Sequence, residues 1–77
     1  MMTVMFDGKK LRALRIEKKL TQEQLAEFSG VSDRHIRSLE NNCVNPSAHV
    51  LFRISRALGT PMDRLMTAYE EDEAHIH

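Results

Sequence analysis

The chain has 77 residues, a single cysteine, and eleven basic and eleven acidic residues. This length allows one small domain with a modest core, and one cysteine excludes an internal disulfide and a paired-cysteine zinc site. No apolar run approaches the roughly 18 residues of a membrane span, and the apolar opening is too short for a secretory signal, so we expect a cytoplasmic protein.

The balanced total charge hides an asymmetry along the chain. All eleven Lys and Arg residues lie before residue 68 together with seven acids, which leaves this part at +4, whereas residues 70–73 carry four acids. A mildly basic body is typical of a domain that binds a polyanion, although an ordinary solvated surface would give the same count. We therefore expect one domain over residues 1–69 and a mobile acidic tail over residues 70–77.

The first two predicted helices span about residues 8–19 and 21–29. Thr21 followed three residues later by Gln24 forms a capping box, so the second helix should begin there. Gly30 should end it as a left-handed residue. Arg15 lies on the flank of the first helix. At about 100° per residue, Leu11, Leu14 and Lys18 share one face of the first helix, and Leu25, Ala26 and Ser29 form the inner stripe of the second.

Three further helices are predicted after Gly30. Ser32 is a good N-cap for a helix that ends near Asn41. Ser47 should cap a fourth helix, which Gly59 stops. Pro61 should open a short fifth helix that continues to about residue 66. The inward residues of these helices include Ile36, Leu39, Leu51, Ile54 and Leu58. Five helices with short polar links predict a compact all-α domain.

The link between the second and third helices is only three residues long, Gly30-Val31-Ser32. Two helices joined so closely through a glycine must cross at a steep angle, which is the helix-turn-helix signature. Val31 can place its side chain between them. The side of the third helix opposite its apolar residues then carries only groups that hydrogen-bond: Asp33, Arg34, Arg37, Ser38 and Asn41.

This polar side fits the major groove of DNA, where an α-helix can reach the base edges. Residues in the first part of such a helix usually reach the bases, so the expected base contacts are Asp33, Arg34, Arg37 and Ser38. Arginine recognises guanine, and an aspartate can accept from cytosine. Asp33 has an equally good alternative role, because an acid in the first turn stabilises the helix dipole without touching a base.

The segments LRALRIEKKLTQEQLAEFSGVSDRHIRSLEN and NPSAHVLFRISRALGTP carry a combination of motifs between residues 9 and 61. This combination resembles the phage repressor and Cro-type helix-turn-helix family, also called the xenobiotic-response-element family. The resemblance implies a five-helix lambda-repressor-like fold. It also implies a sequence-specific DNA-binding transcriptional regulator, most simply a repressor or autoregulator that binds a palindromic operator as a dimer.

The same resemblance assigns roles to individual residues. Gln22 would bind a phosphate and brace the recognition helix, and Asn41 would contact a phosphate just past that helix. Arg15 and Glu40 would form a structural salt bridge between the first and third helices, a position that the helical angles also favour. The residues that match base-reading positions of the family are Asp33, Arg34 and Ser38.

The chain departs from the family pattern at the recognition helix and in the loop that follows it. Family members often have Gln where this chain has Asp33, so base preference cannot be transferred. Asn42 replaces an expected glycine, and Cys43 and Val44 occupy positions where a basic residue is common. We therefore expect weak phosphate contacts from this loop, which leaves more of the binding to helix N-termini, Gln22 and the arginines.

Apolar residues outside the predicted core favour a homodimer, because paired modules read two half-sites about one helical turn apart. These residues are the opening segment 1–6, Ile16 and a C-terminal group comprising Met62, Leu65, Met66 and Tyr69. The predicted dimer forms mainly through the fifth helix and its neighbours. The alternative is that these residues have a purely structural role and close the core of a single protomer. The acidic tail is a candidate competitor of DNA for the basic surface.

Other functions have less support in the sequence. An antitoxin or another protein-interaction module could use the same fold with a protein partner in place of DNA. No nucleophile elbow or comparable constellation suggests an enzyme, and no cofactor or membrane partner is expected. His75 and His77 lie two residues apart near the acidic run, but three ordered ligands are not in evidence, so no metal site is predicted.

Overall fold

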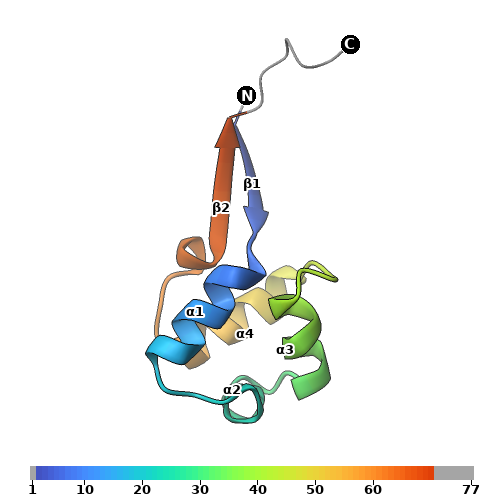
Figure 1. Cartoon of the computed structure of the whole chain (residues 1–77). Coiled ribbons are helices and arrows are strands. Elements are labelled where there is room, and N and C mark those ends of the chain that lie inside the picture. Colours follow the sequence, from blue (N-terminus) through green and yellow to red (C-terminus); the bar gives the residue numbers. More distant parts are fainter. Residues whose placement is uncertain (1, 71–77) are drawn as a thin grey trace.

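The computed structural model of the protein describes residues 2–70, which form four α-helices, a short 3₁₀ helix and two strands (Figure 1). In chain order the elements are β1 (Met2–Phe6), α1 (Gly8–Glu17), α2 (Gln22–Ser29), α3 (Asp33–Glu40), α4 (Ala48–Leu58), η1 (Met62–Leu65) and β2 (Met66–Glu70). None of the helices in this range is long and apolar enough to cross a membrane.

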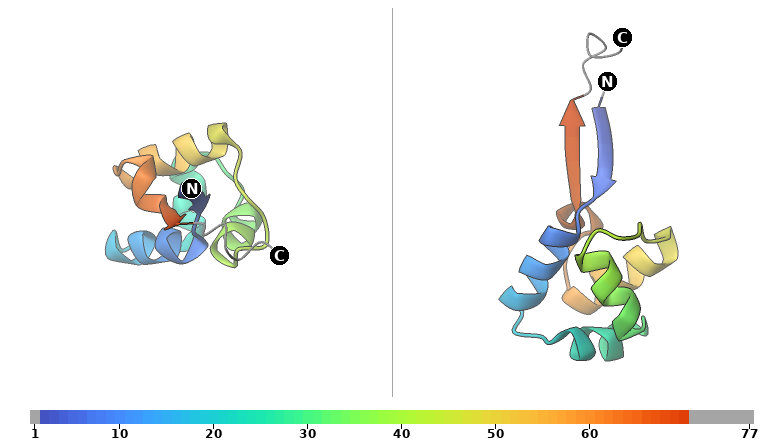
Figure 2. Two further views of the ribbon diagram at one scale, coloured as in Figure 1. Left: turned by 90° about the horizontal axis from the view of Figure 1, so that it is seen from above. Right: turned by 45° about the vertical axis from the view of Figure 1, so that its right-hand side comes forward.

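The helices pack into one body, and the two strands project from it as an antiparallel ribbon (Figures 1 and 2). The ribbon makes the described chain elongated, with extents of 45 × 21 × 21 Å. The register pairs Met2 with Glu70 at the far end and Phe6 with Met66 at the root. The first and last elements of the described residues therefore form a single arm, which we call the hairpin.

The helix ends lie where the sequence predicts them in most cases. Thr21 and Gln24 form the reciprocal capping box at the start of α2, and Ser32 and Ser47 cap α3 and α4. Gly30 ends α2 in the left-handed conformation, with a φ of 74° that costs a residue without Cβ little. Gly59 ends α4 in the same way. Hydrogen bonds made by these caps satisfy backbone groups that a helix end leaves unpaired.

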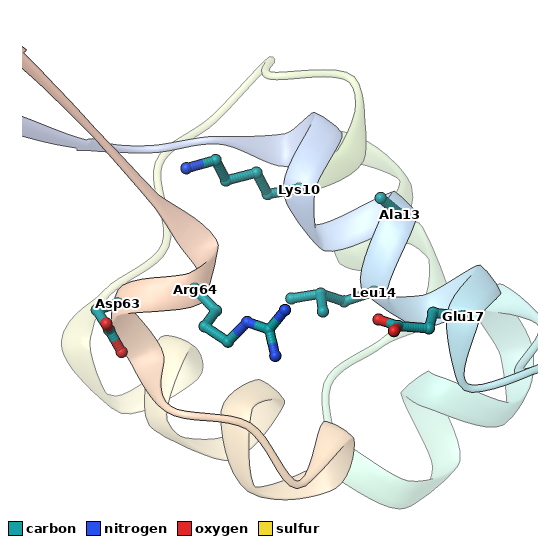
Figure 3. Close-up of a pocket in the computed structure, with 6 residues that line it drawn as sticks. All are labelled: Lys10, Ala13, Leu14, Glu17, Asp63 and Arg64. Carbon is teal, nitrogen blue, oxygen red and sulfur yellow. The ribbon is translucent and has the colours of Figure 1, made fainter.

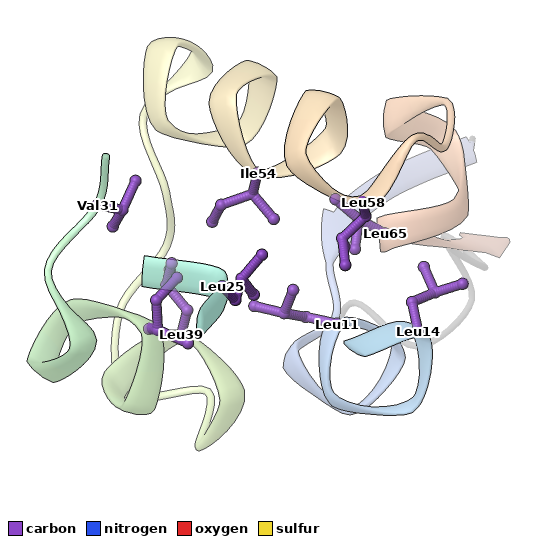
Figure 4. Close-up of a cluster of buried hydrophobic side chains, with 9 residues drawn as sticks. Leu11, Leu14, Leu25, Val31, Leu39, Ile54, Leu58 and Leu65 are labelled. Atoms are coloured by element: carbon purple, nitrogen blue, oxygen red, sulfur yellow. The ribbon is translucent and has the colours of Figure 1, made fainter. Parts of the chain in front are cut away.

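The core lies between α1, α2, α3 and α4 and is closed by η1 (Figure 4). Leu11, Leu25, Ile36, Leu39, Ile54 and Leu65 have no exposed surface. Leu14, Val31 and Leu58 complete this cluster of buried residues. Most of the predicted inward positions are therefore confirmed, while Leu51 and Ala26 pack against the cluster as partly buried residues. Lys18 is an exception, because α1 ends at Glu17 and the Lys18 side chain is exposed.

The prediction of five α-helices is wrong at the C-terminal end of the fold. Residues 62–65 form one turn of 3₁₀ helix, Pro61 precedes it without a side-chain cap, and Met66 is already extended. The chain cannot continue as a helix here because residues 66–70 pair with residues 2–6. The domain is mostly helical with a small sheet, and the apolar opening segment is one of its two strands.

Because the predicted fifth helix is a 3₁₀ turn followed by a strand, the residues predicted for the dimer interface lie on different elements than expected. Leu65 is fully buried in the core of its own protomer, so its side chain is not available to a partner. Met62 lies on η1 and is 42% exposed, and Tyr69 lies on β2 and is 50% exposed. Met66 is half-buried at the root of β2.

The first helix is also shorter than predicted. It ends at Glu17, the amide of Lys18 donates to the Leu14 carbonyl, and Lys19 takes a left-handed φ of 60°. The turn is therefore made two residues before the expected boundary.

Asp7 joins the hairpin to the helical body. Its Oδ1 accepts from the amide of Lys9 at the start of α1 at 2.9 Å, and its Oδ2 accepts from the Thr67 hydroxyl of β2 at 2.9 Å. Its own amide donates to the Leu65 carbonyl. The bond from the Lys9 amide, followed by that from Thr67, lowers the pKa of the Asp7 carboxyl, because both favour the ionised form.

Candidate nucleic-acid interface

The turn between α2 and α3 is fixed by Gly30 and by the two residues on either side of it. Val31 is buried in the core cluster, and its amide donates to the Ser29 hydroxyl at 3.2 Å. The left-handed backbone at Gly30 turns the chain sharply enough to bring Ser32 to the start of α3. In Figures 1 and 2, α3 crosses α2 at a steep angle, as the short link predicts.

The turn leaves one side of α3 facing solvent. Ile36 and Leu39 point into the core with no exposed surface, whereas Arg34 on the opposite side is exposed. The Arg37 and Asp33 side chains are 55% and 46% exposed. Ser38 is half-buried and Asn41 is exposed just after the helix. The structure therefore places all five predicted polar residues on or next to one accessible surface, which we call the α3 face.

Arg15 and Glu40 form a buried pair that fixes α3 to α1. Arg15 Nε donates to Glu40 Oε2 at 2.6 Å, and its Nη2 donates to Oε1 at 3.1 Å. A third bond runs from Arg15 Nη1 to the Leu20 carbonyl at 2.8 Å, in the link between α1 and α2. The two side chains are 11% and 3% exposed. A two-point contact of this kind has a defined geometry as well as a charge, so it sets where α3 lies.

Gln22 connects this buried pair to the α3 face. Its Nε2 donates to Glu40 Oε1 at 3.1 Å, and its Oε1 accepts from Arg37 Nε at 3.3 Å. Arg37 Nη2 also lies 3.4 Å from Asp33 Oδ2. One chain of contacts thus runs from Arg15 in α1 to Asp33 at the start of α3. The hydrogen bond from Gln22 to Glu40 agrees with the bracing role that the resemblance implies. The hydrogen bond between Gln22 and Arg37 was not predicted from the sequence.

The loop after α3 is tied back to the first helix. Asn42 takes a left-handed φ of 57°, and its Oδ1 accepts from the Gly8 amide at 2.8 Å. Asn is one of the few residues that tolerate this conformation, which explains how it replaces the expected glycine. Cys43 and Val44 are exposed in this loop and supply no positive charge toward the α3 face.

A separate hollow of about 610 Å³ lies between α1 and η1 (Figure 3). It is lined by Lys10, Ala13, Leu14, Glu17, Asp63 and Arg64. Two cations and two carboxylates balance one another there, so the hollow has no charge bias toward a polyanion. Among residues 2–70, no group of three or more metal-ligating side chains is assembled, and His75 and His77 lie outside the described residues.

A helix-turn-helix family model matches residues 11–65, which run from Leu11 within α1 to the end of η1 and include the whole α3 face. The chain belongs to this helix-turn-helix family. It is the same phage repressor type that the sequence motifs resemble.

Curated relatives of this helix-turn-helix chain are named as regulators. It is 34% identical over 73 residues to the immunity repressor protein of Bacillus phage phi105, a match that covers 91% of this chain and 51% of the relative. It is 38% identical over 64 residues to the HTH-type transcriptional regulator y4dJ of Sinorhizobium fredii, covering 83% of each. The chain thus spans about half the length of the phage immunity repressor.

Solved structures share the helix-turn-helix fold. The restriction-modification controller protein C.AhdI from Aeromonas hydrophila superposes with a TM-score of 0.73 at 33% identity, covering 75% of this chain and 88% of that one. The P22 c2 repressor protein, solved in complex with a synthetic operator, gives a TM-score of 0.71 with the same identity and coverage.

Proposed function

We propose that this protein binds double-stranded DNA through the α3 face and acts as a transcriptional repressor. The observation that carries the proposal is the exposure of Arg34 and Arg37 on a helix whose opposite side is locked into the core. An exposed polar helix held at the edge of a small domain can enter the major groove without rearrangement of the fold.

Arg34 and Arg37 are the proposed readers of guanine, since arginine binds both O6 and N7 of that base. Arg37 is held on two sides, by Gln22 and by Asp33, so its guanidinium is oriented before DNA arrives. Asp33 then positions Arg37 and is also the proposed acceptor toward cytosine. Ser38 lies one helical turn after Arg34 on the same face and is the fourth proposed base contact.

Phosphate contacts are proposed for the start of α2 and the end of α3. Gln22 lies at the first position of α2, where unpaired amides favour an anion. Asn41 is exposed directly after α3. Because both side chains are neutral, the charge component of phosphate binding falls to the arginines and helix N-termini, and we expect a shallow dependence of affinity on salt.

The proposed working form is a homodimer on a palindromic operator. One α3 face reads only a few base pairs, and two of them spaced by one helical turn, roughly 34–36 Å, combine their contacts. The P22 c2 repressor, whose fold this chain shares, was solved with an operator. The naming of the phage phi105 relative as an immunity repressor favours repression over activation.

Selection of bound sequences from a random duplex library tests the proposal. The full chain should recover a two-fold symmetric site, and a variant with both Arg34→Ala and Arg37→Ala should recover none. Enrichment of the same site by both proteins would show that α3 is not the reading element. Absence of any enriched site at low salt would favour a protein-interaction role for the fold instead.

A further inference from the structure

The hairpin carries a continuous apolar face. In an antiparallel pair, residues that lie directly opposite share one side of the sheet. The observed register therefore puts Met2, Val4, Phe6, Met66 and Ala68 on one side, with Glu70 opposite Met2 at the tip. The other side carries Thr3, Met5, Thr67 and Tyr69. We call the first side the hairpin face.

This face has a buried root and an open tip. Phe6 packs against the core cluster, whereas Met2 and Val4 are 60% and 57% exposed. A two-stranded ribbon is marginally stable alone in water, and it becomes stable when its apolar side is covered. The body of the protomer covers only the root, so the outer half of the hairpin face lacks apolar cover among the described residues.

A groove lies where the hairpin face meets the body. It has a volume of about 240 Å³, and its apolar lining comes from both the hairpin and the start of α4. The lining residues are Val4, Met5, Phe6, Asn45, Pro46, Leu51 and Met66. The groove is thus an apolar recess at the root of the hairpin face, and the other end of that face presents the long, flexible side chain of Met2.

We infer that the hairpin face is the dimer interface and that its occupant is the hairpin of a second copy of this chain. A two-fold axis through the Val4–Ala68 pair would run the two hairpins in opposite directions, so that the tip of each lies on the root of the other. Met2 of each copy then fills the groove of its partner. This inference rests on the dimer in the proposed function and specifies the surface that forms it.

The charge distribution fits a second copy. Residues 2–6 and 66–69 contain no charged side chain, so two identical faces meet without like-charge repulsion in their centre. The acid Glu70 is at the tip, and the cations Lys9 and Lys10 follow the root at the start of α1, where Lys10 Nζ donates to the Met66 carbonyl. Opposed hairpins therefore place the acid of one copy near the cations of the other, which is complementary.

Charge substitutions at Val4 test the inference, because this residue would lie closest to its own symmetry mate. The full chain, Val4→Glu and Val4→Lys should be compared by sedimentation equilibrium at micromolar concentration, together with Thr3→Glu on the opposite side of the same strand. Each Val4 variant should raise the dimer dissociation constant about a hundredfold, because like charges would meet at the axis. Thr3→Glu should change the dimer dissociation constant by no more than a few-fold relative to the unsubstituted chain.

Mixing the two Val4 variants provides the decisive measurement. A glutamate facing a lysine places opposite charges across the axis, so the equimolar mixture should form a heterodimer at concentrations where each variant alone, with its weakened self-association, stays monomeric. This rescue cannot arise from unfolding, which circular dichroism of each variant checks independently. A mixture that stays monomeric, or Val4 variants that dimerise as the unsubstituted chain does, would overturn the inference.

The outcome is separable from DNA recognition. Binding of the Val4 variants to a duplex that carries one selected half-site reports on the α3 face alone. If the Val4 variants still bind the half-site but do not alter dimerisation as predicted, the proposed interface is wrong and the proposed DNA-binding role of the α3 face is unaffected. If half-site binding is absent in the full chain as well, the proposed function fails whatever the oligomeric state.

Discussion

Arg15 and Glu40 are 25 residues apart in sequence, and their side chains form a two-point ion pair that is almost completely enclosed. Glu40 is the last residue of α3, so this pair determines the position of the helix that presents the α3 face. Its low exposure separates it from the other ion pair described on α3, Arg37 with Asp33, which is about half exposed on both sides.

Removal of one member of the buried pair should cost much stability. In Glu40→Ala the guanidinium of Arg15 remains enclosed without its carboxylate, and such a loss typically costs about 3–5 kcal/mol. Urea unfolding monitored by circular dichroism measures the change. Asp33→Ala is the control, because it breaks the exposed pair and should cost no more than about 1 kcal/mol. Equal losses in both variants would contradict the structural role of Glu40.

The α3 arginines should matter for DNA and not for folding. Arg34→Ala and Arg37→Ala should each weaken binding to the selected operator by about 1–3 kcal/mol, measured by fluorescence anisotropy, with unfolding midpoints nearly unchanged because both side chains are exposed. Arg56→Ala removes the same charge from α4, where the guanidinium lies 5.7 Å from the centre of the Phe52 ring. An equal loss of affinity in this control would indicate a general charge effect.

Gln22 should act on DNA binding partly through Arg37. Because Gln22 Oε1 accepts from Arg37 Nε, Gln22→Ala frees the guanidinium that it holds. The double variant should then lose less affinity than the sum of the two single losses, since contacting residues are energetically coupled. Operator titrations of the four proteins measure this coupling. Strict additivity would mean that Gln22 contacts DNA independently.

Two glycines should respond very differently to alanine. A Cβ on Gly8 would lie 2.0 Å from the Leu39 carbonyl oxygen, a backbone atom that cannot move aside. Gly8→Ala should therefore displace α1 from α3 and prevent stable folding. Gly59 has a left-handed φ of 64° but open space around it, so Gly59→Ala should cost only the backbone strain of about 1–2 kcal/mol. Thermal unfolding followed by circular dichroism compares the two.

Asp7 should make stability depend on acid pH. Its pKa is lowered in the folded protein, so the ionised form stabilises the fold above the ordinary pKa of about 3.9, and this contribution disappears as the pH falls through the lowered value. Asp7→Asn can still cap α1 but has no charge. Urea unfolding should give a higher free energy of unfolding for the original chain than for Asp7→Asn at neutral pH. This difference should vanish below the lowered pKa of Asp7. A difference that is constant with pH would exclude this role.

Local signals in the sequence were sufficient for much of the helical body. The capping box at Thr21, the serine caps and the glycine stops are short-range chemistry, and they predicted where α2, α3 and α4 begin and end. Apolar spacing predicted most of the core because a helix repeats every 3.6 residues. The polar side of α3 followed from the same periodicity, and the structure places those residues on one accessible surface.

The hairpin could not be predicted in this way. Residues 2–6 and 66–70 pair although nearly the whole chain separates them. No short turn joins the two segments, so no local motif indicates which strand each pairs with. Residues 60–63 carry a helix start signal, yet pairing with β1 holds Met66 in an extended conformation. Tertiary contact overrides local propensity where the two compete.

The sequence by itself determined helices α2, α3 and α4, their caps and the identity of the outward residues on α3, because these depend on neighbours within a few positions. Only the tertiary structure decided how those residues are held. The contacts of Gln22 with Glu40 and Arg37, and the burial of Leu65 in place of its predicted exposure, join elements that lie far apart in the chain. Periodicity gives the direction of a side chain on its own helix, but its partners depend on how the helices pack.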